Sequence, residues 1–267
     1  GLAGRSVTAF PSASPLLQTK LYFPRSRSGL VSRTRLIERL NQAIEGRLTV
    51  VCAPAGFGKT TLLGQWLASK TAAAWLSLDH SDNEPTLFWA YLIAALQTVH
   101  AEIGQTTLSL LRSPQPLPVE TLLGPLLNEV ASLTQRSVLV LDDYHLIDNQ
   151  PIHEAIAFLL DHLPAQLHLV IASRADPSLP LSRLRARGQL TELRASDLRF
   201  TVDEAVTFLN DIAGLDLTKE DVAALEARTE GWIAGLQLAA LSMRGRDDVA
   251  GFIGAFTGND RYIVDYL

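Results

Sequence analysis

Cysteine is nearly absent from the sequence, in which Cys52 is the only one among 267 residues. A single cysteine excludes a disulfide within the chain and a metal cluster built on several thiolates. The sequence also has no apolar run near the ~18 residues that a membrane-spanning helix needs, and its N-terminus lacks a secretory pattern. We therefore predict a protein of the reducing cytoplasm that does not enter a membrane.

Basic residues are fewer than acidic ones, with 23 Lys and Arg against 28 Asp and Glu and a formal charge of −5. A domain that grips a nucleic-acid backbone carries an excess of basic residues, so we expect no direct DNA binding by these residues. The charge is also uneven. Residues 1–47 carry eight basic and two acidic residues, whereas residues 203–267 carry five and twelve, and this asymmetry indicates separate modules.

Gly, Ala, Ser and Pro are abundant in residues 1–15, which show no apolar period, and we predict a flexible arm there. From residue 16 to residue 200, five short apolar runs alternate with stretches in which apolar residues recur at helical spacing. Continuous apolar runs are typical of strands buried on both faces, and their alternation with helices indicates a three-layer, mainly parallel sheet. The predicted strands are residues 48–53, 74–78, 137–141, 167–172 and 189–194.

After residue 200 the strand signals stop and helical signals take over. Thr201 and Glu204 have the spacing of a capping box, in which two residues cap a helix start reciprocally. Thr218 is placed to open a second helix, and apolar residues from Trp232 to Met243 recur at helical spacing. We therefore predict an α/β domain over residues 16–200, followed by a small all-α domain over residues 201–267.

The segment from Ala53 to Thr60 has the pattern of a phosphate-binding loop, because it follows an apolar strand and opens a helix. A strand that turns into a helix through glycines aims consecutive backbone N–H groups at one point, where phosphates bind. Lys59 adds a charge for the β- and γ-phosphates, Thr60 an oxygen for Mg²⁺, and Thr61 a hydroxyl within reach of the α-phosphate. We predict a P-loop NTPase fold that binds a purine nucleoside triphosphate with Mg²⁺, through Pro54, Ala55, Gly56, Phe57, Gly58, Lys59, Thr60 and Thr61.

Two acidic residues, Asp142 and Asp143, follow the third predicted strand. Ligands of open α/β sheets bind at the carboxyl edge of the strands, so we expect both side chains near the phosphate loop. Asp142 is predicted to hold Mg²⁺ through water. For Asp143 two interpretations stay open, since it could orient or deprotonate an attacking water or could be a solvated strand terminus.

Arginine follows the fourth predicted strand, as Arg174. It could contact the γ-phosphate and report its presence, or it could form an ordinary surface ion pair. Arg183, Arg185 and Arg187 make a basic run that favours a solvated face over a reach toward a neighbouring subunit's nucleotide. The predicted catalytic set is therefore Lys59, Asp143 and Arg174.

Several ordered segments together resemble the STAND class of P-loop ATPases, most closely the MalT-like, ATP-dependent large LuxR-type transcription activators. The similarity extends over nearly the whole chain from Leu17 onward. It is carried by residues 19–21, 30–33, 54–61, 75–79 with 82–83, 139–145, 172–174, 184–188, 198–201 and 231–236.

This resemblance implies a nucleotide-binding domain with a helical lid, with adenine held near Val31 and Arg33 and with Trp232 and Ile233 of the lid near the nucleotide. It also implies a switch, in which ADP stabilises a resting form and ATP with an inducer favours a form that self-associates. Slow ATP hydrolysis resets such a switch. The inducer and promoter DNA would bind to regions that are absent from this sequence.

Two other functions are compatible with the same loop. The chain could be a metabolic ATPase or kinase, which would need an acceptor site that the sequence does not reveal. It could also be a scaffold with a purely structural ADP, which would bind ADP tightly and show no turnover.

Overall fold

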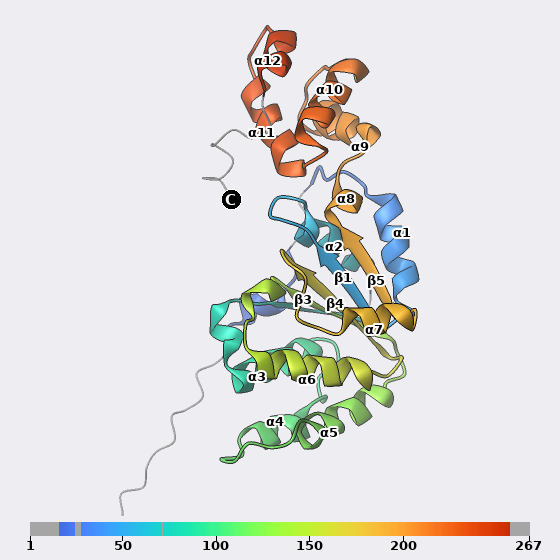
Figure 1. The fold of residues 1–267 in the computed structure, drawn as a ribbon, viewed down its shortest axis with the longest axis vertical. Coiled ribbons are helices and arrows are strands. Elements are labelled where there is room, and N and C mark those ends of the chain that lie inside the picture. Colours follow the sequence, from blue (N-terminus) through green and yellow to red (C-terminus); the bar gives the residue numbers. More distant parts are fainter. Residues whose placement is uncertain (1–15, 25–27, 71, 257–267) are drawn as a thin grey trace, which may run out of the picture.

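The computed structural model describes residues 16–24, 28–70 and 72–256. The predicted arm at residues 1–15 and the last part of the predicted all-α domain, residues 257–267, therefore lie outside the described residues. The centre of the molecule is a five-stranded sheet in the order β2-β3-β4-β1-β5, in which all pairs are parallel (Figure 1). The predicted P-loop NTPase fold with its parallel sheet is confirmed, and its strands are β1 (Leu48–Cys52), β2 (Ala73–Ser77), β3 (Ser137–Asp142), β4 (Leu167–Ser173) and β5 (Leu190–Arg194).

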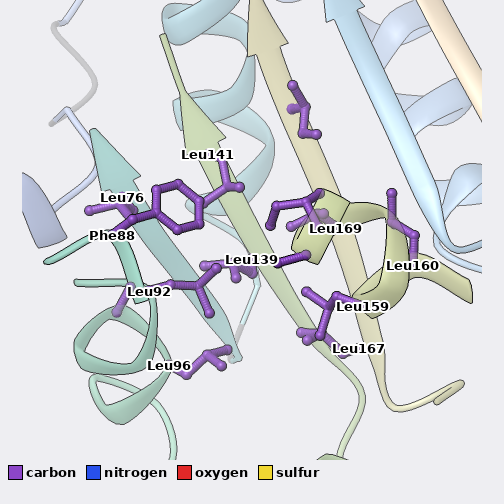
Figure 2. Close-up of a cluster of buried hydrophobic side chains, with 14 of the residues drawn as sticks. Leu76, Phe88, Leu92, Leu96, Leu139, Leu141, Leu159, Leu160, Leu167 and Leu169 are labelled. Atoms are coloured by element: carbon purple, nitrogen blue, oxygen red, sulfur yellow. The ribbon is translucent and has the colours of Figure 1, made fainter. Parts of the chain in front are cut away.

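Helices cover both faces of this sheet. Successive side chains of each strand point to opposite faces, so every buried strand offers apolar side chains to both helical layers. On one face, Val51, Val140 and Val170 pack with helices α1 and α2. On the other, the buried strand residues pack with helices α3, α5 and α6, and Figure 2 shows Leu139 and Leu169 of the sheet beside Phe88 and Leu159. The helices of these two layers are α1 (Thr34–Ala43), α2 (Lys59–Leu67), α3 (Pro85–Gln97), α5 (Val119–Ala131) and α6 (Gln150–Asp161).

Short elements connect this framework. The prolines of residues 114–118 lie in the loop between α4 and α5. No helix in the described part of the chain is long and apolar enough to cross a membrane. The connecting elements are η1 (Gln18–Leu21), η2 (His80–Asn83), α4 (Gln105–Leu111), η3 (Tyr144–Leu146), α7 (Leu181–Ala186) and α8 (Ala195–Leu198).

The helices after residue 200 pack on a third hydrophobic cluster of their own, which Val31 joins from the N-terminal segment. The predicted capping box is present, since the Thr201 hydroxyl accepts from the Glu204 N–H and the Glu204 carboxylate from the Thr201 N–H. A division of the chain at residue 200 stays a prediction. These elements are α9 (Val202–Val206), the wider π-helical turns η4 (Thr207–Ile212), α10 (Lys219–Thr229), α11 (Ile233–Met243) and α12 (Val249–Ala255).

Candidate functional site

The loop between β1 and α2 has the backbone of a phosphate cradle. Gly56 and Gly58 take φ values of +79° and +73°, a left-handed conformation that glycine adopts without strain. Gly58 is also the N-cap residue of α2, and no side chain caps this helix start. The first N–H groups of α2 are thus available for an anion, and the partial positive charge of the helix start favours one.

Lys59 is the first residue of α2, directly after this loop, and its side chain is buried. Its ammonium donates hydrogen bonds to the carbonyl oxygens of Ala53 at 2.7 Å and Pro54 at 3.0 Å. Burial lowers the pKa of Lys59, Arg174 lowers it further, and the carboxylates of Asp142 and Asp143 oppose both effects. A positive charge therefore lies at the phosphate loop, in contact with two carbonyl oxygens and near two carboxylates.

Thr60 and Asp142 meet beside Lys59. The Thr60 hydroxyl donates to the Asp142 carboxylate over 2.9 Å, and the other carboxylate oxygen accepts from the Asp143 N–H at 3.1 Å. Asp142 is only 4 % exposed, and burial together with the charge of Asp143 raises its pKa to about 6. A hydroxyl and a carboxylate are hard oxygen ligands of the kind that Mg²⁺ prefers.

The protein contribution to such a metal site is small. Within residues 16–24, 28–70 and 72–256, no group of three or more His, Cys, Asp or Glu side chains is arranged to hold a metal ion. Mg²⁺ usually keeps several waters and takes one or two protein ligands together with phosphate oxygens. Thr60 and Asp142 fit that pattern.

Asp143 has an unusual backbone. Its φ of +57° is left-handed, a conformation that only Glu230 shares among the non-glycine residues described. Its side chain is 44 % exposed, with one oxygen 3.9 Å from Nδ1 of His145. The carboxylate therefore stands at the sheet edge in contact with solvent, where it could meet a water molecule.

Arg174 follows the end of β4, the strand between β1 and β3. It is exposed, and in the part of the chain that the structure describes its guanidinium has no ion-pair partner. Its charge lowers the pKa of both Lys59 and His145, so it lies near the phosphate loop. By contrast, Arg183 pairs with Asp161 and Arg185 with Glu192 of the same chain, in agreement with a solvated face.

A cavity of about 570 Å³ opens beside the phosphate loop, between the N-terminal segment and the helices that follow residue 200. Its walls include five of the predicted nucleotide-binding residues, Val31, Arg33, Gly58, Thr61 and Ile233. The remaining lining is mostly apolar, with two amide side chains at Gln65 and Gln237. Such a cavity is typical of small-molecule sites, which combine apolar walls with a few polar groups.

Arg33 has more than one role in this geometry. Its guanidinium donates to the Leu198 carbonyl at 2.7 Å and to the Glu204 carboxylate at 3.2 Å, and it lies over the Phe200 ring. Arg33 thus joins the N-terminal segment to the start of α9 at the same place where it lines the cavity. The adenine contact that the resemblance implies for it stays a prediction.

Trp232 is not among the residues that line the cavity, and it contacts the phosphate loop instead. Its indole N–H donates to the Ala55 carbonyl at 3.1 Å, and the Ala234 N–H donates to the Gly56 carbonyl at 3.1 Å. Its ring also lies 6.4 Å from the Phe57 ring, measured between centroids. The start of α11 therefore lies directly against the loop.

Both amide side chains of the cavity lie outside the set of residues predicted from the sequence. Gln65 follows Thr61 by four positions on α2, and Gln237 follows Ile233 by four positions on α11, so each lies one turn beyond a predicted site residue. Helical spacing from Thr61 would have been enough to find Gln65. Its amide also donates to the Val31 carbonyl at 3.2 Å, which connects α2 to the N-terminal segment.

Comparisons with known proteins identify the family of the domain. The family model described as "AAA ATPase domain" matches residues 29–172. The HTH-type transcriptional regulators MalT of Serratia proteamaculans and of Yersinia pestis are each 41 % identical over 229 residues, which is 86 % of this chain and 25 % of theirs. The chain thus spans about a quarter of the length of these relatives.

Two solved structures share the fold at low sequence identity. The Walker-type ATPase of Pyrococcus abyssi has a TM-score of 0.52 and 15 % identity, over 86 % of this chain and 73 % of that one. A signal transduction ATPase with numerous domains (STAND) and a tetratricopeptide repeat sensor, from Pyrococcus horikoshii, has a TM-score of 0.54 and 16 % identity. That similarity covers 95 % of this chain and 34 % of the other.

Proposed function

The chain belongs to the AAA ATPase domain family, and on this basis we propose that it is the ATP/ADP-binding switch module of a signal-transducing transcriptional activator. In this proposal the chain binds an adenine nucleotide with Mg²⁺. Slow hydrolysis of ATP returns the module to an ADP-bound resting state.

The observation that carries the proposal is the pair of hydrogen bonds between the start of α11 and the phosphate loop. Trp232 and Ala234 donate to carbonyl oxygens of Ala55 and Gly56, in the loop whose N–H groups are available for phosphates. A change in that loop between ATP and ADP would therefore reach the helices after residue 200 through direct contacts. A ligand shifts an equilibrium only through contacts that differ between two states, and we propose that this pair of hydrogen bonds differs between the ATP-bound and ADP-bound forms.

Each part of the nucleotide has protein groups suited to it. Val31, Arg33, Thr61 and Ile233 line the cavity proposed for adenine and ribose, and its apolar walls favour a base. The N–H groups of residues 55–59, together with the Lys59 ammonium, suit the phosphates. Thr60 and Asp142 would hold Mg²⁺, which when bound neutralises part of the phosphate charge.

Hydrolysis requires a water that is oriented and deprotonated. The exposed carboxylate of Asp143, beside Asp142 at the end of β3, is proposed to accept the proton of that water. Arg174 is proposed to interact with the γ-phosphate oxygens, because it lies close to Lys59 and has no ion-pair partner in the described residues. Its charge would then distinguish ATP from ADP.

The wider assignment follows the relatives. MalT is named as an HTH-type transcriptional regulator, and this chain corresponds to about a quarter of it. We propose that regions outside this sequence bind the inducer and promoter DNA, and that ATP promotes self-association of the whole protein. A cytoplasmic location goes with this proposal.

The first experiment is to denature the purified chain and to identify and quantify the released nucleotide, followed by steady-state hydrolysis with and without Mg²⁺. We expect stoichiometric ADP and Mg²⁺-dependent turnover well below the ~10 s⁻¹ typical of enzymes. Rapid turnover with an empty site would favour a metabolic ATPase. Tight ADP with no turnover at all would favour a structural role for the nucleotide.

A further inference from the structure

Asn83 joins two loops at the carboxyl edge of the sheet, a role that no local sequence pattern indicates. It ends η2, the turn after β2, and its side chain reaches the loop that follows Asp143. Its amide nitrogen donates to the Leu146 carbonyl at 2.8 Å, and its amide oxygen accepts from the N–H groups of Asp148 at 2.8 Å and Asn149 at 3.2 Å. The nitrogen also donates to the His80 carbonyl at 3.2 Å.

This set uses the full hydrogen-bonding capacity of an amide, which has two donor hydrogens and two acceptor lone pairs. The contact is also reciprocal, because the amide of Asn149 donates to the Asn83 carbonyl at 3.0 Å. Asn149 in turn caps the start of α6 through Ile152. The loop at residues 146–149 is thus held on one side by Asn83 and on the other by α6.

The turn that ends at Asn83 is itself held by ion pairs between its acidic residues and Lys20. The ammonium of Lys20, a residue of η1, contacts Asp82 at 2.5 Å and Asp79 at 3.0 Å, and Asp82 is fully buried. Asp79 and Asp82 also form the capping box of η2. The amide of Asn83 therefore projects from a turn whose own position is fixed by charged contacts.

The loop that Asn83 holds follows Asp143, the residue proposed to accept the proton of the attacking water. Asp143 has a left-handed φ of +57°, a conformation that aspartate adopts more readily than most residues, and the residues that follow contact its backbone. Its carbonyl oxygen accepts from the Leu146 N–H, which closes the turn η3, and the Leu146 carbonyl is the atom to which Asn83 donates. A direct path of two hydrogen bonds thus leads from Asn83 to the Asp143 backbone.

We propose that Asn83 is a positioning residue for ATP hydrolysis, which fixes the Asp143 carboxylate by holding residues 146–149. The inference rests on the proposed function, because it assumes that Asp143 accepts the proton of the attacking water. Asn83 does not contact the phosphate loop, so it acts on hydrolysis and leaves nucleotide binding unchanged.

Asparagine suits this position for a specific reason. Aspartate has the same shape and keeps both acceptor oxygens, but it cannot donate to Leu146, and its charge would face that carbonyl oxygen. Asn83→Asp therefore removes the donor half of the bridge and leaves the volume unchanged. Asn128 is exposed on α5, so Asn128→Asp is a matched control for the added charge.

The experiment measures ATP and ADP affinity by calorimetry, and it measures the rate of single-turnover hydrolysis per bound nucleotide. Misfolded protein binds no nucleotide and therefore does not affect this rate. Asn83→Asp and Asn83→Ala should each reduce the hydrolysis rate at least tenfold and change both affinities less than twofold, whereas Asn128→Asp should match the wild type. In Asp143→Asn, addition of Asn83→Asp should cause less than a twofold further loss, because residues that act through one group are not additive.

Amide hydrogen exchange gives a readout that does not depend on activity. Exchange at residues 146–149 should accelerate in Asn83→Asp, while α2 stays protected. Normal hydrolysis in Asn83→Asp, a multiplicative loss in the double variant or normal turnover of Asp143→Asn would each overturn the inference. A wild-type chain that binds no ATP would instead overturn the proposed function, so the two failures are distinguishable.

Discussion

The hydroxyl of Thr60 donates to the carboxylate of Asp142 over 2.9 Å, although the two residues lie 82 positions apart. Thr60 lies in the first turn of α2, the helix after β1, and Asp142 ends β3, with β4 between these strands. Parallel strands end at one edge of the sheet, so the fold brings both oxygens to the phosphate loop. The same burial that places Asp142 there also makes its negative charge costly.

The first prediction is a pH dependence of stability that comes from Asp142. Its pKa is about 6 in the folded protein against 3.8 ordinarily, so the folded state keeps a proton that the unfolded state has released. The free energy of unfolding therefore falls as pH rises through this interval, by up to about 3 kcal/mol. Asp142→Asn should remove this dependence and be more stable than the wild type at pH 8.

Urea unfolding of the nucleotide-free protein at pH 4, 5, 6 and 8 tests this, with Asp211→Asn as an exposed control on η4. The difference between Asp142→Asn and the wild type should grow with pH up to about 6 and then stay level. A difference that is constant across the series would contradict the assignment of the raised pKa to Asp142.

Lys59→Ala is predicted to weaken the binding of ATP and ADP at least tenfold. The ammonium is the central positive charge of the loop, and each hydrogen bond to a charged group contributes about 1.5–3 kcal/mol, which is at least tenfold in affinity. Calorimetry with ATP and ADP measures the effect, and Lys219→Ala, in the exposed first turn of α10, is the control. Unchanged ATP affinity in Lys59→Ala would rule out the site.

Gly56→Ala is predicted to separate α11 from the phosphate loop. A Cβ at Gly56 would lie 2.7 Å from the Ala234 Cβ and 2.8 Å from the Trp232 indole nitrogen, and φ there is +79°. The left-handed conformation alone costs about 1–2 kcal/mol for a residue with a side chain. We expect ADP release, followed by stopped-flow fluorescence, to accelerate at least fivefold.

Gly124→Ala is the matched control for that experiment. Gly124 lies inside α5, where a Cβ would meet no atom within 4 Å, so alanine should stabilise the helix by roughly 0.5–1 kcal/mol. ADP release should then equal that of the wild type. Equal release rates in the two alanine variants would show that α11 does not control the nucleotide.

Local sequence signals predicted the parts of this site that depend on strand ends and turns. The strand before Ala53 and the strand before Asp142 are continuous apolar runs, and the glycines between Ala53 and Lys59 specify the loop. Trp232 and Ala55, by contrast, lie 177 positions apart, and their hydrogen bond depends on how the last helices pack. No local period encodes such a contact, because tertiary packing alone decides it.

The bridge made by Asn83 was missed for the same reason. An asparagine after a strand reads as a turn residue, and its partners at residues 146–149 are more than 60 positions away. The π-helical turns of η4 were also missed, since they interrupt an ordinary helical pattern after the capping box at Thr201. Sequence periodicity predicted the five strands of the sheet, and the long-range polar contacts needed the structure.

Arg174→Ala is predicted to reduce the difference in affinity between ATP and ADP. If its guanidinium contacts the γ-phosphate, its loss weakens ATP binding by about 1.5–3 kcal/mol and leaves ADP binding nearly unchanged. Arg187→Ala is the control, because this exposed arginine follows α7 on the basic run. Calorimetry with both nucleotides gives the ratio of the two affinities, and an unchanged ratio would remove the sensor role.

Glu204→Gln is predicted to loosen the helices after residue 200 from the rest of the chain. The Glu204 carboxylate accepts from both Arg33 and Arg35 at 3.2 Å, and its side chain is 12 % exposed. Removal of one partner of a buried pair leaves the other charge uncompensated, so we expect a loss of about 3 kcal/mol in the free energy of unfolding. Glutamine can keep the capping box with Thr201, which confines the change to the two ion pairs.

Urea unfolding measures the loss of stability, and the affinity for ADP is measured on the same variant. Glu220→Gln, in the exposed first turn of α10, is the control. Arg33 also lines the cavity proposed for adenine, so Glu204→Gln should weaken ADP binding severalfold although Glu204 itself lies outside the cavity lining. A loss of stability with unchanged ADP affinity would make the Arg33–Glu204 contact a purely structural one. A loss of both stability and ADP affinity would show that the Arg33–Glu204 contact couples the helices after residue 200 to the bound nucleotide.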